Sequence, residues 1–200
     1  MTPTATGLMT AEEFYDWACL PENADRKWEL DDGVPVELEG PDVPPPGQLH
    51  GLVIWFILTR LTDYVRRRQS GHMFPNDTGL VVKRRPDTVR GPDLMLFLDS
   101  LTLDQAGYGY VDRVPALVVE VVSPSDKASA LRRRVAQYVK RGVPLVWVVY
   151  PDERTVSVHR PGRPTAELDW DDEVSFPDVL PDFACKVSDL FALPGAPPVA

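Results

Sequence analysis

The sequence has few cysteines and no long apolar segment. Its 200 residues include two cysteines, Cys19 and Cys185, and neither lies near a second Cys or His at metal-ligand spacing. This argues against a disulfide framework and favours a reduced intracellular protein. The longest apolar run, residues 51–58, is much too short to span a bilayer. Residues 1–14 lack the basic and apolar regions of a signal peptide. We therefore expect a cytoplasmic protein with no membrane partner.

The chain also lacks an excess of positive charge and any glycine-rich phosphate-binding motif. Its formal net charge is −9, which excludes a polycation that coats nucleic acid. No G-x-G-x-x-G or Walker sequence follows a strand, and this disfavours a doubly wound nucleotide-binding fold. The hydrophobic content of 44% suits one globular domain with a sizeable core. We expect that domain over residues 8–192, followed by a proline-rich flexible tail over residues 193–200.

Local patterns in the first third of the chain predict a helix, a hairpin and a second helix. Thr10 and Glu13 have the spacing of a capping box. Residues 27–38 contain an Asp-Gly turn between short apolar runs, which is typical of a β-hairpin. Residues 48–68 have apolar residues at three- and four-residue spacing, as in an amphipathic helix. The predicted buried face of this helix consists of Leu49, Leu52, Val53, Phe56, Leu61, Tyr64 and Val65.

The rest of the chain predicts a mixed sheet. Residues 86–92 are expected to separate two of the strands, and residues 99–114 to form a loop. A helix over residues 127–141 is long enough to connect two parallel strands by a right-handed crossover. The predicted fold class is therefore α/β, a mixed β-sheet flanked by helices, with an N-terminal helix and β-hairpin. The expected strands cover residues 78–85, 93–98, 116–122, 143–151 and 155–160, the last at an edge of the sheet.

One strand of this sheet contains a charged residue. Glu120 lies between valines in a run that is expected to be buried on both faces. Such a group is costly to bury unless it is paired, hydrogen-bonded or bound to a metal. Asp93 follows Pro92 at the start of another apolar strand, although alone this pair is more simply a turn. A structurally satisfied glutamate is the alternative for Glu120. Together, two carboxylates on core strands favour a shared Mg²⁺ or Mn²⁺ ion.

The order of several motifs resembles that of a nuclease family. The motifs are WELDDG (28–33), a helix-opening His50, GPDLMLF (91–97), VVEVVSPSD (118–126), YVKRGVPLVWVVYP (138–151), TVSVHR (155–160) and VLPDFACKVSDLF (179–191). Over residues 8–192 the chain resembles the Uma-type bacterial restriction-endonuclease-like proteins of the PD-(D/E)XK nuclease superfamily. The resemblance implies a restriction-endonuclease-like core, a Mg²⁺ or Mn²⁺ cofactor, hydrolysis of phosphodiester bonds in DNA, and a homodimer.

The resemblance also implies roles for individual residues. Asp93 and Glu120 would be metal ligands, and the backbone carbonyl of Val121 could be another. Glu29 matches an acid that the family carries and would join the metal or water network, whereas a solvated hairpin residue is the alternative. His50 would contact a substrate phosphate, with a helix cap or a packing residue as the alternative.

The sequence departs from the superfamily at its basic residue. The superfamily has Lys two residues after the acid, where this chain has Val122. In Uma-type proteins the Lys comes from the following helix, four residues before a Tyr, and here Arg134 precedes Tyr138 at that spacing. Arginine stays protonated and cannot act as a base, but Arg134 could hold the scissile phosphate. Lys127 would be a second donor on the same helical face.

The departure leaves two other functions open. One is a catalytically weak or inactive nuclease-fold protein that binds nucleic acid or another protein. The other is a metal-dependent phosphohydrolase of small nucleotides. Residues 127–141 contain six basic residues and no acid, and residues 60–90 have a net charge of +5. These two basic segments favour phosphate-backbone contacts, although solvated helix ends would give the same pattern.

Overall fold

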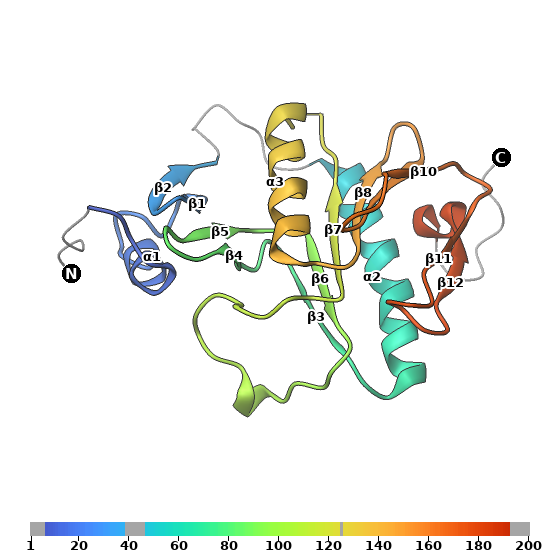
Figure 1. Ribbon diagram of the computed structural model, residues 1–200, viewed down its shortest axis with the longest axis horizontal. Helices are drawn as coiled ribbons and strands as arrows, with labels where there is room; N and C mark the ends of the chain where they lie inside the picture. Colours follow the sequence, from blue (N-terminus) through green and yellow to red (C-terminus); the bar gives the residue numbers. More distant parts are fainter. Residues whose placement is uncertain (1–6, 39–46, 125, 193–200) are drawn as a thin grey trace.

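The computed structural model describes residues 7–38, 47–124 and 126–192. Its largest sheet has the strand order β10-β9-β8-β7-β6-β3 (Figure 1). Only the β7–β8 pair is parallel among the pairs of this sheet, and the other neighbours are antiparallel. The predicted mixed sheet with a crossover helix is confirmed. The strands are β3 (His72–Pro75), β6 (Leu94–Phe97), β7 (Leu117–Val121), β8 (Val146–Tyr150), β9 (Thr155–His159) and β10 (Ala166–Leu168).

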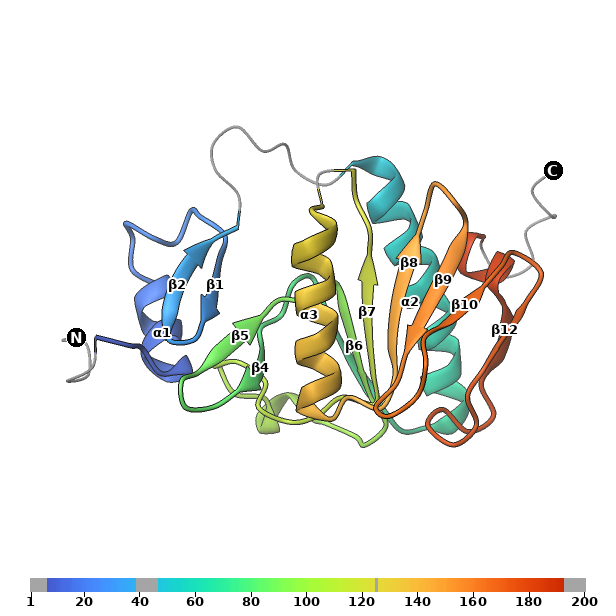
Figure 2. The same cartoon turned by 45° about the horizontal axis from the view of Figure 1, so that its top comes forward.

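Helices α2 (Gln48–Arg68) and α3 (Ala128–Arg141) cover opposite faces of this sheet (Figure 2). Side chains alternate between the faces along each strand, so the odd-numbered residues of β7 pack with α2 and Val118 packs with α3. Glu120 is even-numbered and therefore lies on the face that α3 covers. Gly142 ends α3 in the left-handed conformation, with φ of 96°.

A smaller sheet holds the N-terminal part of the chain. Its strand order is β2-β1-β5-β4, and α1 (Ala11–Ala18) packs against it. The predicted capping box of Thr10 and Glu13 is present, and so is the Asp-Gly hairpin. The strands are β1 (Trp28–Asp31), β2 (Val34–Glu37), β4 (Leu80–Lys83) and β5 (Thr88–Arg90). The remaining elements are η1 (Leu103–Gln105), β11 (Glu173–Ser175), β12 (Ala184–Lys186) and η2 (Val187–Phe191).

Some sequence-based expectations were wrong. Residues 155–160 do not form an edge strand, because β10 pairs along the outer side of β9. Residues 86–92 contain β5 and are not only a separator. Leu49 and Leu52 are about half exposed, because apolar residues extend around more than one face of α2 and the sheet covers only part of them. The residues of α2 that are buried are Val53, Ile57, Leu61 and Tyr64.

Other expectations concern the termini and the cysteines. The tail over residues 193–200 lies outside the described residues, and so do residues 39–46 of the proline-rich stretch 39–48 between the hairpin and α2. Cys19 and Cys185 are both unpaired. Among the described helices, none combines the length and the apolar character that crossing a membrane requires.

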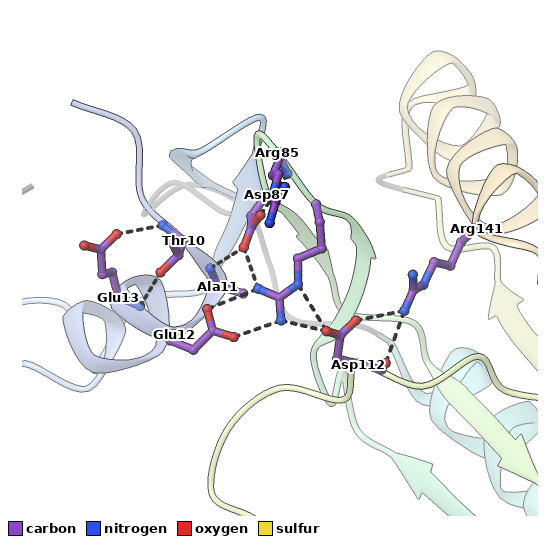
Figure 3. Close-up of polar contacts among 9 residues, drawn as sticks. Thr10, Ala11, Glu12, Glu13, Arg85, Asp87, Asp112 and Arg141 are labelled. Atoms are coloured by element: carbon purple, nitrogen blue, oxygen red, sulfur yellow. Dashed lines mark hydrogen bonds and ion pairs between the residues drawn. The ribbon is translucent and has the colours of Figure 1, made fainter. Parts of the chain in front are cut away.

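An ion-pair cluster joins α1 to the rest of the protein (Figure 3). The guanidinium of Arg84 contacts three carboxylates, at 2.8 Å from Glu12, 2.6 Å from Asp87 and 2.7 Å from Asp112. Asp112 also accepts a hydrogen bond of 2.8 Å from Arg141 on α3. One arginine therefore connects α1, the β4–β5 turn and the loop before β7, and Asp112 extends this connection to α3.

We expect Arg84→Ala to lower the free energy of unfolding by about 1–3 kcal/mol, measured by urea denaturation. Asp87 is buried, and without Arg84 its charge would keep only the backbone N–H groups of Ala11 and Arg85. The matched control is Arg132→Ala, an exposed arginine that forms no ion pair within the described part of the chain. The control should change stability by no more than about 0.5 kcal/mol. An equal effect of the two substitutions would contradict a structural role for the cluster.

Candidate active site

One cleft contains every residue that the sequence predicts for the site. Its volume is about 610 Å³. The cleft lies at the carboxyl end of β7, where the hairpin, the first turns of α2 and the start of α3 meet. Strand β7 lies between β6 and β8, so the site is at an interior strand of the sheet. The predicted residues that line it are Glu29, His50, Asp93, Glu120, Val121, Lys127 and Arg134.

Glu120 is buried on β7, with 4% of the residue exposed. Both of its carboxylate oxygens accept hydrogen bonds from α3. The Tyr138 hydroxyl donates to Oε1 at 2.6 Å, and Arg134 Nη2 donates to Oε2 at 3.2 Å. Burial raises the pKa of Glu120 to about 8; Arg134 opposes this shift, and the negative charge of Asp93 adds to it. The Glu120 carboxylate is thus held by side chains of α3, the helix that follows β7 in sequence.

Asp93 connects β6 to β7 at the same end of the sheet. Its Oδ2 accepts a hydrogen bond of 2.6 Å from the backbone N–H of Val121, and its Oδ1 lies 3.5 Å from His50 Nε2. The side chain therefore does more than begin a strand. Asp93 raises the pKa of His50 by a hydrogen bond, burial opposes the shift, and the Val121 backbone adds to it. The N-cap of α2 is Gly47, and α2 has no side-chain capping bond, so the helix-cap alternative for His50 is wrong.

Glu29 enters the cleft from β1. It is 8% exposed, so the alternative of a solvated hairpin residue is wrong. Arg90 Nη1 donates to Oε2 at 3.1 Å, and the Gly91 N–H donates to Oε1 at 3.3 Å. Burial raises the pKa of Glu29, although the positive charges of Arg90 and Arg134 oppose the shift. The hairpin thus contributes an acid whose two oxygens are both held.

Arg134 lies where the family spacing places the basic residue. Its Nη2 is 3.2 Å from Glu120 and 3.4 Å from Asp126 Oδ1, so a helix-borne cation does reach the acid of β7. Lys127 is exposed at the rim, immediately before α3. Asp126 also accepts a hydrogen bond of 2.8 Å from the backbone N–H of Ser123.

Three of these partners were not predicted as site residues. In the sequence, Tyr138 marked only the family spacing, although its position four residues after Arg134 could have indicated a common partner. Asp126 is the last residue of the VVEVVSPSD motif, and no role was predicted for it. Arg90 had no local signal, because its contact with Glu29 joins residues 61 apart in sequence.

The donor atoms in the cleft suit a hard divalent cation. Asp93, Glu120 and the carbonyl of Val121 offer oxygen donors, and Mg²⁺ commonly binds one or two carboxylates while keeping several waters. Within residues 7–38, 47–124 and 126–192, no three His, Cys, Asp or Glu side chains converge as a metal site. An ion held here would therefore depend on two carboxylates, a backbone oxygen and water.

Tertiary contacts neutralise much of the two basic segments. On α3, Arg133 pairs with Asp31 and Arg141 pairs with Asp112. The sequence count suggested two basic surfaces, but acids that are distant in sequence lie against many of these cations. The positive charge left for phosphate contacts is smaller than the sequence suggested. The pairs of the other segment are Arg60–Asp189, Lys83–Asp32, Arg84 with Glu12, Asp87 and Asp112, and Arg90 with Glu29 and Asp31.

Comparisons with known proteins identify the family and the fold of the chain. A family model described as "Uma2: Putative restriction endonuclease" matches residues 11–188. Among solved structures, the chain is similar to "a putative nuclease belonging to DUF820" from Anabaena variabilis, with a TM-score of 0.71 and 22% identity. The match covers 92% of this chain and 97% of that chain, and it confirms the predicted fold class. No curated protein matches. Because this family model spans most of the sequence, the chain belongs to the Uma2 family.

Proposed function

We propose that this protein is a Mg²⁺- or Mn²⁺-dependent endonuclease that hydrolyses phosphodiester bonds in DNA. The observation that carries the proposal is the convergence of Asp93, Glu120 and the Val121 backbone in one cleft, with Arg134 against Glu120. The family description supports a nuclease, and oxygen donors suit these metals. We also propose that two copies act together, because cutting both strands of a duplex takes two sites.

Some side chains of the cleft would stabilise negative charge on the phosphate, and others would accept a proton. A divalent ion at Asp93 and Glu120 would lower the pKa of a bound water and offset charge on the phosphate. Tyr138 and Arg134 fix the orientation of the Glu120 carboxylate. Because arginine stays protonated, Arg134 would bind phosphate oxygens and would not remove a proton. Its Nε is buried and has no hydrogen-bond partner among the described residues.

The proton of the attacking water needs a different acceptor in the cleft. Glu29 and His50 line the cleft, can accept a proton and are not themselves proposed as metal ligands. Glu29 is held by Arg90 and the Gly91 N–H, so its position is well defined. We propose that one of these two groups accepts the proton, directly or through water.

A second candidate function is that of a catalytically weak or inactive protein that binds nucleic acid or another protein. It is favoured by the position of Arg134, whose Nη2 already pairs with Glu120 and Asp126. An arginine engaged by two acids is less available to a phosphate. The superfamily lysine that could orient water is replaced by Val122.

We expect the purified protein to nick supercoiled plasmid in Mg²⁺ or Mn²⁺ and to stop when EDTA is added. Asp93→Asn, purified in parallel, controls for contaminating nucleases and should nick far more slowly, since the amide lacks the negative charge that holds the cation. Turnover of mononucleotides without plasmid nicking would instead indicate a small-molecule phosphohydrolase. Absence of nicking in both metals, or equal nicking by the variant, would refute the endonuclease proposal.

A further inference from the structure

The groups that would act on a phosphate are buried at the floor of the cleft. The side chains of Asp93 and Glu120 are 13% and 6% exposed, and that of His50 is 12% exposed. The hairpin, the first turns of α2 and the start of α3 line the same cleft. A substrate phosphate must therefore enter between these elements to reach the groups at the floor.

The size of the cleft limits what can enter it. Its volume of about 610 Å³ is within the range of about 300–1,000 Å³ that is common for sites of small organic ligands. A nucleotide is a ligand of this size, whereas each base pair of a duplex brings in a second nucleotide and a second backbone. The cleft therefore suits one strand of a nucleic acid better than a stacked duplex.

Apolar side chains form part of the cleft walls. Leu38 directly follows β2, Ile54 belongs to α2, and Pro75 ends β3. Leu38 is 45% exposed, and its backbone N–H donates to the carbonyl of Lys27 at 3.0 Å. In a duplex the bases are stacked on one another and present only their edges in the grooves. An apolar wall can therefore pack against unstacked bases but gains little contact with paired ones.

The apolar surface continues from Leu38 along β2. Val36 lies opposite Glu29 in the hairpin, and residues that are directly opposite share a face of the sheet. Because Glu29 lines the cleft, Val36 is on the cleft side of the hairpin. Val34 is two residues away on the same strand and so lies on the same face. Val36 and Val34 are 42% and 50% exposed, so a strip of half-exposed apolar side chains leads away from the cleft.

From these features we infer that the cleft accepts a single, unpaired strand of DNA in preference to a duplex. The inference rests on the proposed function and names its substrate class. The scissile phosphate would lie at the floor of the cleft, a neighbouring base would pack against Leu38, and further bases would pack against Val36 and Val34. Lys127, which is exposed at the rim, would contact the phosphate backbone of this strand.

Cleavage of matched oligonucleotides tests the inference. A fluorescein-labelled DNA strand without self-complementary sequence is offered alone and annealed to its complement, and initial rates in Mg²⁺ and in Mn²⁺ are read from denaturing gels. We expect the single strand to be cut about tenfold faster or more. Equal rates, or faster cleavage of the duplex, would overturn the inference and leave the endonuclease proposal standing.

Binding gives a second readout that does not need turnover. Fluorescence anisotropy of the same two DNAs is recorded in Ca²⁺, which also takes oxygen ligands, at one fixed ionic strength. We expect the single strand to bind more tightly than the duplex. If neither DNA is cut but the single strand binds more tightly, the endonuclease proposal fails and the single-strand inference stands. If neither is cut and the two bind equally, or neither binds, both proposals fail.

Leu38→Ala and Leu52→Ala form a matched pair of variants for the binding measurement. Both leucines are 45% exposed, and Leu52 lies on α2 outside the cleft. Leu38→Ala should weaken single-strand binding by about fivefold and leave duplex binding unchanged, whereas Leu52→Ala should change neither. Leu38→Trp should tighten single-strand binding, because bases stack on aromatic rings. If Leu38→Ala weakens the binding of both DNAs equally, or of neither, Leu38 does not contact unpaired bases and the inference is overturned.

Discussion

Glu120→Gln is expected to slow plasmid nicking in Mg²⁺ by on the order of 10²–10³-fold, the scale of losing one group that stabilises charge in a transition state. The amide has the shape of the carboxylate and can still accept the hydrogen bond from Tyr138. It lacks the charge that a divalent cation needs from its ligand. The measurement is the initial rate of loss of supercoiled plasmid at saturating protein.

The control for this variant is its stability without metal. The pKa of Glu120 is raised from 4.5 to about 8 by burial, so its contribution to folding is present below pH 4.5 and is lost as the pH rises through about 8. The metal-free wild-type protein should lose stability from this group over that range, and Glu120→Gln should lose less.

Glu167→Gln, at an exposed glutamate outside the cleft, should leave nicking unchanged. Nicking by Glu120→Gln at the wild-type rate would contradict the proposed role.

Glu120 could be found from sequence because it breaks a local pattern, whereas Asp93 was indicated only together with Glu120, and Glu29 only by the family resemblance. A glutamate between valines in a buried strand needs a partner, and the alternation of the strand predicts which face it occupies. The crossover helix then provides that partner, since Arg134 and Tyr138 are four residues apart and both reach Glu120. The sequence predicted that Glu120 needs a partner and that Arg134 holds the position of the basic residue, and the structure places Arg134 against Glu120; the contact with Tyr138 was not predicted.

The contacts that join distant segments could not be found in this way. Strand β5 has three residues and pairs with β1 at a single register position, Leu30 with Val89, which no periodicity indicates. The same limit applies to charge, because a segment that is basic in sequence can face acids from elsewhere in the fold. Arg133 and Asp31 are 102 residues apart. Charge counted along a chain therefore predicts partners poorly until the fold is known.

Arg90 makes several contacts between segments that are distant in sequence. Its guanidinium is buried, with 4% of the residue exposed, between the hairpin and α3. It donates to Glu29 at 3.1 Å, to Asp31 at 2.5 Å and to Gln137 of α3 at 2.8 Å, and also to the carbonyl of Leu30 at 3.1 Å. One side chain thus sets the position of the hairpin wall of the cleft relative to the helix wall.

We expect Arg90→Met to lower the free energy of unfolding by about 3–5 kcal/mol, because it leaves the buried Glu29 without the cation that pairs with it, and leaves Asp31 with Arg133 alone. Arg90→Lys keeps the charge but not the planar fork, so its loss should be intermediate. The matched control is Arg133→Met, which removes the other cation of Asp31. Its side chain is 58% exposed, and the cost should stay below about 1 kcal/mol. Urea denaturation in EDTA measures all three.

A second substitution separates the buried charge from the packing of the arginine. If unpaired Glu29 accounts for much of the loss, then Arg90→Met/Glu29→Gln should be more stable than Arg90→Met alone, and the two effects should not add. If the double variant is instead less stable by the sum of the two, the arginine stabilises the fold through its other contacts. If Arg90→Met lowers the free energy of unfolding no more than Arg133→Met does, the proposed role of Arg90 in holding the hairpin against α3 is contradicted. Because Lys27 and Glu29 line the cleft from this hairpin, a protein without Arg90 should also hold this wall of the cleft less firmly.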